Sequence, residues 1–88
     1  MIDVNKISKE RADSLIYDLE DWMCLVGRKE DWLIDEEEDG EKIFGSKAGY
    51  LLELIDWVKS HVCKEDGRNP KWWISHGFTE SEAELLAE

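Results

Sequence analysis

The groups in this chain with the most obvious chemistry are carboxylates, and one run of them resembles a calcium-binding loop. Residues 35–40 place acids at the first, third and fifth positions of such a loop and Gly40 at the sixth, where the loop turns sharply. The twelfth position, which should supply a bidentate Glu, is Ser46. Because partial matches arise easily in acid-rich chains, the sequence favours a solvated acidic turn over a metal site.

The thiols and imidazoles are suitable zinc ligands, but their spacing does not fit a zinc site. Structural zinc sites bring four ligands together, usually including a close pair of cysteines. Here Cys24 and Cys63 lie far apart, and only His61 and Cys63 are near neighbours. The chain also has no recognisable nucleophile turn and no glycine-rich phosphate loop. We therefore expect two reduced cysteines, no metal, no cofactor and no enzymatic activity.

The acidic run is the first candidate for a partner-binding surface. From Glu30 to Glu41 the chain carries eight acids and no base, with Trp32 among them. A ring beside carboxylates suits an Arg-rich partner, because Arg pairs with carboxylates and stacks on aromatic faces. The candidate partner-binding residues in this run are Trp32, Asp35, Glu36, Glu37, Glu38, Asp39 and Glu41. The alternative is a solvated face that only keeps the protein soluble.

The second candidate is the adjacent pair Trp72 and Trp73. Neighbouring helical residues point about 100° apart, so burying both rings fully requires contacts on two sides. One ring is then left partly exposed beside His76, and exposed Trp is enriched among binding hot spots. The alternative is that both rings fill the core of a small helical protein.

The net charge of the chain limits the kinds of molecule that it can bind. The net charge is −11, of which residues 1–45 contribute −8 and residues 46–88 contribute −3. Nucleic acid and anionic membranes repel such a chain, so a basic protein surface is the expected partner. The start of the sequence shows no secretory h-region, and no apolar run approaches the length of a membrane span. We expect a soluble cytoplasmic protein.

The positions of apolar and capping residues predict a mainly α, single-domain helical bundle over residues 1–88. Apolar residues recur every three or four positions over 8–26 and again over 46–64, which predicts two long helices. Ser8 and Gly27 are suited to begin and end the first, and Ser46 precedes the second. The stretch 46–64 has the widest apolar surface and is the expected centre of the core. Its main apolar row is Ala48, Leu51, Leu52, Ile55, Val58 and Val62, and a second row flanks it: Tyr50, Leu54, Trp57 and His61.

Two short helices are predicted near the carboxyl end. Asn69 can cap a turn of helix that starts at Pro70 and stops at Gly77. Thr79 and Glu82 then have the spacing of a capping box, which predicts a last helix over 80–87.

Residues 28–45 break the helical period. Apolar clusters at 32–34 and 43–44 bracket the acidic run and the turn pair Asp39 and Gly40, which predicts a short acidic β-hairpin between the two long helices. A plain acidic loop is the alternative. A hairpin that folds back would make the long helices antiparallel, although the length of the segment permits either orientation.

The combined pattern predicts a small acidic protein-binding module. The favoured hypothesis is an inhibitor that covers the basic, nucleic-acid-binding surface of another protein by presenting an array of carboxylates. Its size and charge are similar to those of phage and bacterial inhibitors of nucleic-acid enzymes, although no sequence motif carries the likeness. The alternatives are an assembly or adaptor subunit, or a toxin-neutralising immunity protein, with an apolar Trp-rich interface; a homodimer is compatible with these.

Overall fold

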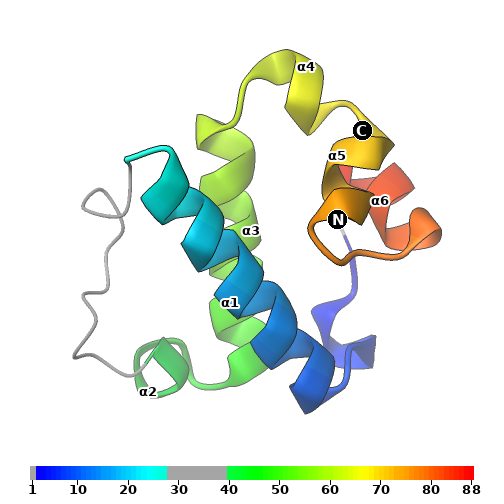
Figure 1. The fold of residues 1–88 in the computed structure, drawn as a ribbon. Helices are drawn as coiled ribbons and strands as arrows, with labels where there is room; N and C mark the ends of the chain where they lie inside the picture. Colours follow the sequence, from blue (N-terminus) through cyan, green and yellow to red (C-terminus); the bar gives the residue numbers. More distant parts are fainter. Residues whose placement is uncertain (1, 28–39) are drawn as a thin grey trace.

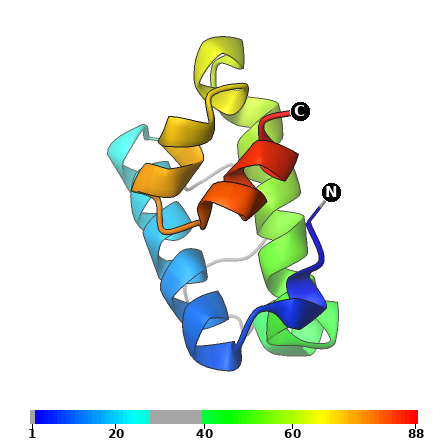
Figure 2. The ribbon, with the colours of Figure 1, turned by 90° about the vertical axis from the view of Figure 1, so that its right-hand side faces the viewer.

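Two long helices, α1 (Lys9–Leu25) and α3 (Lys47–His61), form the centre of the computed structural model, which describes residues 2–27 and 40–88. They pack against each other. The short helices α5 (Pro70–Ser75) and α6 (Glu80–Leu86) lie across one side of the pair (Figure 1, Figure 2). The described residues are mainly helical and include no strand, which confirms the predicted helical class.

Local capping fixes where the two long helices begin. The hydroxyl of Ser8 accepts a hydrogen bond from the Arg11 N–H (3.2 Å), and that of Ser46 accepts one from the Gly49 N–H (3.0 Å). These bonds satisfy amide groups that have no partner within the helix. After α1 the chain leaves the helix at Gly27, whose φ of +73° is readily adopted only by residues such as glycine. The predicted first helix is confirmed.

The core forms where the apolar faces of the helices meet, with one shift in α3. Tyr50 and Leu54, predicted to flank the main apolar row, are buried, whereas Ala48 and Leu52 are only half-buried. The buried face of α3 is displaced because α1, α2 (Gly40–Phe44) and the amino-terminal turn all contact α3. The buried core consists of Ile2, Val4, Ala12, Leu15, Ile16, Leu19, Met23, Tyr50, Leu51, Leu54, Ile55, Val58, Trp73, Phe78, Ala83 and Leu86.

The relative direction of the long helices differs from the antiparallel expectation. Both views show α1 and α3 running in the same general direction (Figure 1, Figure 2). Residues 26–46 make this possible, because 21 residues can span up to about 70 Å, whereas α1 is only about 25 Å long. The chain therefore has ample length to return to the starting end of the bundle.

The helix α2 (Gly40–Phe44) precedes α3. Most of the predicted hairpin lies outside the described residues. Ile43 and Phe44, which formed one of its two apolar clusters, belong to α2. Phe44 stacks on Tyr50 with ring centroids 5.9 Å apart, while Ile43 is 52% exposed. Phe44 is thus the member of the pair that faces the core.

The carboxyl-terminal third follows its capping signals closely. Asn69 caps α5 with Pro70 in the first turn, and Gly77 ends it with φ +103°. Thr79 and Glu82 form the predicted capping box of α6. The second long helix ends earlier than predicted, at His61, and a separate single turn, α4 (Lys64–Gly67), begins at the last residue of the predicted stretch.

The amino-terminal residues join the core. A turn of 3-10 helix, η1 (Val4–Lys6), contacts α3, and the side chains of Ile2 and Val4 are buried. Within the described residues, every helix is too short or too polar to cross a lipid bilayer.

Candidate functional site

The acidic partner-binding residues proposed from the sequence lie almost wholly outside the described residues. This holds for Trp32, Asp35, Glu36, Glu37, Glu38 and Asp39, while Glu41 is placed only as part of the α2 backbone. Their role in binding a partner stays a prediction.

The two adjacent tryptophans have different environments. Trp73 has no exposed surface, and its indole N–H donates to the carbonyl of Gly67 at 3.0 Å. Trp72 is half-buried and meets two other rings edge-on: Trp73, with centroids 4.8 Å apart, and Trp22 of α1, with centroids 5.5 Å apart. Trp73 therefore acts as a core residue, and Trp72 is the member of the pair with surface left for a partner.

A histidine and an aspartate join α5 to α1 beside this cluster. The ring of His76 lies against Trp72 with centroids 4.3 Å apart, and its Nδ1 contacts the Asp18 carboxylate at 2.5 Å. The nearby hydroxyl of Ser75 donates to the backbone carbonyl of Trp72. The His76–Asp18 contact thus orients the imidazole and links two helices. The Ser75 hydroxyl bonds within α5.

A second link joins α1 to α6. The guanidinium of Arg11 donates two parallel hydrogen bonds to the Glu82 carboxylate, at 2.7 and 3.0 Å, which is the geometry of a strong charge-assisted pair. Hydrogen bonding from Arg11 is the largest effect holding the pKa of Glu82 below its ordinary value; burial opposes it, and the Thr79 N–H adds to it. The same bonds raise the pKa of Arg11. This pair is structural, because both charged groups are satisfied by each other.

The outer face of α1 is the acidic surface that the structure does describe. Tyr17 is 76% exposed and is the one aromatic side chain among the exposed large hydrophobic residues of the described part. Asp13 and Asp21 lie four residues before and after it, and Glu10 lies seven before, so all four share a face. Asp13 pairs with Lys47 of α3 at 2.5 Å. The face combines an exposed ring with carboxylates.

The two cysteines are unbonded thiols at the surface. Cys24 and Cys63 are both free and exposed, and the Cys63 thiol donates to the Asp66 carboxylate at 3.1 Å. Within residues 2–27 and 40–88, no group of three or more Cys, His, Asp or Glu side chains is placed to hold a metal ion.

The sequence reasoning missed a group of cations at the far end of α3. Lys59, Lys64 and Arg68 line one surface pocket of this acidic chain. The signal was present in the sequence, because residues 59–71 carry four bases and two acids, whereas the whole chain has twice as many acids as bases. Only the fold shows that three of these bases converge.

Comparison of the chain with protein-family models, with curated proteins and with solved structures found no match.

Proposed function

We propose that this protein is a small acidic binding module that covers a basic surface of a partner protein, and that it inhibits the binding of nucleic acid there. The observation that carries the proposal is the grouping of carboxylates with aromatic residues. It occurs in the sequence of residues 30–41, which contains Trp32, and on the outer face of α1 in the structure, where Tyr17 is exposed.

The charge density of α1 supports this function. Between Glu10 and Asp21 the helix carries five acids, over about 18 Å of axis. The one base in this stretch, Arg11, is engaged by Glu82 on α6. Three of the acids, Glu10, Asp13 and Asp21, share the outer face with Tyr17, while Asp18 contacts His76 of α5. A groove that binds a phosphate backbone would meet this row of carboxylates on the outer face of the helix.

Tyr17 supplies the second property that an interface needs. Tyrosine is enriched at binding hot spots, because its ring buries a large area while its hydroxyl still forms hydrogen bonds. Of the carboxylates beside it, Glu10 and Asp21 form no ion pair or side-chain hydrogen bond within the described residues. Within residues 2–27 and 40–88, no side chain competes with the Arg or Lys side chains of a partner for these two groups.

The test reverses charge in the acidic run. In the triple variant Asp35→Lys, Glu37→Lys and Asp39→Lys, we expect at least about a hundredfold weaker binding to the partner recovered from cells that express the chain, since each close charge pair at an interface contributes about 1.5 kcal/mol or more. Binding of the unchanged protein should also weaken steeply as salt is raised.

The matched control reverses three exposed acids on other elements: Glu53→Lys, Glu65→Lys and Glu84→Lys. Both triple variants change the net charge equally, so a loss confined to the first identifies the acidic run as the contact. Circular dichroism shows whether each variant keeps its helices. Equal losses in both triples, or a complex that is insensitive to salt, would refute the proposed mechanism.

The second candidate is an assembly or adaptor subunit with an apolar interface. Its support is the end of α1, where Leu25 is 79% exposed and Val26 is 48% exposed. Exposed apolar groups of this kind are typical of surfaces that a second protein covers. Sedimentation distinguishes the two functions, because a tight symmetric dimer favours the assembly subunit and a monomer favours the acidic binding module.

A further inference from the structure

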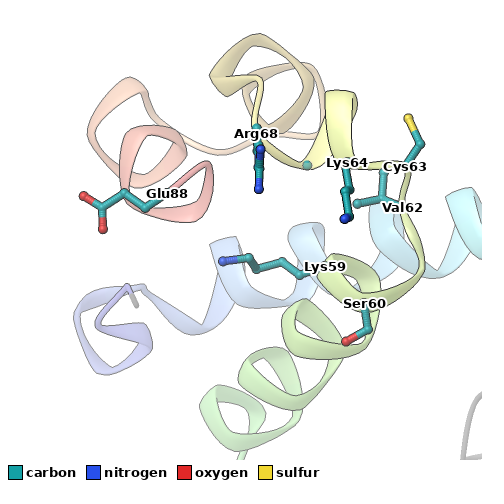
Figure 3. A pocket seen from close by; sticks show the side chains of 8 residues that line it. Lys59, Ser60, Val62, Cys63, Lys64, Arg68 and Glu88 are labelled. Carbon is teal, nitrogen blue, oxygen red and sulfur yellow. The ribbon is translucent and has the colours of Figure 1, made fainter.

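A surface pocket of about 240 Å³ lies between the carboxyl end of α3 and the single turn α4. Lys59 and Ser60 come from α3, Lys64 and Gly67 come from α4, and Arg68 follows directly after it. Figure 3 shows that the charged ends of the three basic side chains face the space between these elements.

The three cations are unpaired among the residues that the structure describes, where none of Lys59, Lys64 and Arg68 forms an ion pair. Like charges that converge on one pocket repel each other, which an anion bound between them would relieve. This arrangement is unexpected in a chain of net charge −11, where a carboxylate is available for every base.

The carboxylates of Asp66 and Glu88 do not fill the pocket. Asp66 is on α4 but accepts a hydrogen bond from the thiol of Cys63, and it does not line the pocket. Glu88 does line it, yet its carboxylate points away from the three cations in Figure 3. The positive charge is therefore directed into open space.

The core holds α4 in place, and α4 with the residue after it carries two of the three cations, Lys64 and Arg68. The carbonyl of Gly67 accepts the hydrogen bond of the Trp73 indole at 3.0 Å, and Trp73 is fully buried. Gly67 also lies close to α3's end, since a Cβ placed on it would come within 3.1 Å of the Val62 side chain. The hydrogen bond from Trp73 and the close approach to α3 thus hold α4 in place, so the ordering needed to bind a ligand is already largely present.

We propose that this pocket binds a small, multiply charged anion of the phosphoryl class, such as a phosphate monoester or a diphosphate. The guanidinium of Arg68 can hold two oxygens at once, while Lys59 and Lys64 act as point charges on the others. The volume lies just below the roughly 300 to 1,000 Å³ of pockets for drug-sized ligands, which suits a small anion. A long polyanion is disfavoured because the rest of the surface repels it.

Titration with pyrophosphate at constant ionic strength, followed by NMR, tests the site. We expect saturable shifts of the Gly67 and Arg68 amide signals and of the Trp73 indole N–H signal. Acetate, with a single charge, should give shifts only at much higher concentration. Titrations with inorganic phosphate and with a sugar phosphate then distinguish a site for the phosphoryl group alone from one that also contacts the attached molecule. Shifts that grow linearly without saturation, or that spread evenly over the protein, would show that no such site exists.

Substitutions of the basic residues test whether pyrophosphate binds in this pocket. The double variant Lys64→Met and Arg68→Met should bind pyrophosphate at least about tenfold more weakly, because it removes two of the three cations. The control Lys6→Met and Lys42→Met changes exposed lysines on other elements and lowers the charge equally, so it should change the affinity by less than about twofold. Equal weakening in both doubles would overturn the assignment.

Two conservative substitutions show whether weak binding by the double variant comes from the lost cations or from an altered fold. Arg68→Lys keeps the charge but loses the paired donors, so an intermediate loss of affinity is expected. Glu88→Gln removes a negative charge at the edge of the pocket and should tighten binding about two- to threefold. An affinity unchanged by both substitutions would contradict the proposed pocket even if the double variant bound weakly.

Discussion

The ion pair between Arg11 and Glu82 offers the sharpest test of how this fold is held together. Substitution of Glu82→Gln keeps the size of the side chain and still permits the capping box, because Gln can replace Glu at this position. It removes the charge that the Arg11 guanidinium contacts at 2.7 and 3.0 Å. The change therefore isolates the link between α1 and α6.

The expected loss of stability follows from the burial of the two groups. Hydrogen bonds to charged groups contribute about 1.5 to 3 kcal/mol, whereas exposed ion pairs contribute about 0.2 to 1 kcal/mol. The Glu82 side chain is 18% exposed, but that of Arg11 is 39% exposed, so solvent screens the pair in part. We expect the free energy of unfolding to fall by about 1 to 2 kcal/mol near neutral pH.

The loss should depend on pH with a definite sign. Glu82 has a folded-state pKa below its ordinary value of 4.5, which also describes the unfolded chain. Its ionised form therefore stabilises the native state above that ordinary pKa, and this contribution disappears as the pH falls through the lower folded-state pKa. The difference in the free energy of unfolding between the unchanged protein and Glu82→Gln should be constant near neutral pH and should disappear in acid.

Urea denaturation followed by tryptophan fluorescence, repeated between about pH 7 and about pH 3, measures this difference. Glu84→Gln is the matched control, since Glu84 lies on the same helix, is exposed, and has no side-chain partner among the described residues. It should change stability by less than about 0.5 kcal/mol. If Glu82→Gln matched this control at neutral pH, or if its deficit persisted in acid, the role assigned to the pair would be wrong.

Two further substitutions probe the core and the turn before α6. Trp73→Phe should lower the free energy of unfolding by about 1 to 3 kcal/mol, because it leaves the Gly67 carbonyl without its donor. Amide hydrogen exchange should then become faster in α4. Unchanged exchange there would contradict the role of the Trp73–Gly67 hydrogen bond. Gly77→Ala should destabilise more than Gly27→Ala in thermal unfolding. At Gly77 the φ of +103° is joined by a contact of 3.2 Å between the new Cβ and Leu15, whereas Gly27 has a φ of +73° and open space around it. Equal melting temperatures for the two glycine variants would show that this crowding is relieved at no cost.

The helices were predictable because their signals are local. Ser8, Ser46 and Asn69 each cap a helix through a bond to an amide two or three residues away, and Thr79 with Glu82 closes a box within one turn. Such contacts need no distant part of the chain, so the sequence alone specifies them. The break between α3 and α4 was missed because the apolar spacing continues through Val62 without a Gly or Pro to interrupt it.

The candidate sites were less predictable, because they depend on which distant residues meet. Trp72 and Trp73 have the same residue type and the same helix, yet only packing against the core buried one fully and left the other half-exposed beside Trp22. The convergence of Lys59, Lys64 and Arg68 likewise required α4 to fold back beside the end of α3.

The sequence by itself determined the helical class, the helix starts and the strong negative charge of this protein, because capping, periodicity and composition act within a few residues of each other. The tertiary structure decided that α1 and α3 run in the same direction, that Arg11 pairs with Glu82 across 71 positions, and that three cations share a pocket. These features arise from contacts between residues far apart in the chain, and apolar spacing specifies which face is buried but not which helix covers it.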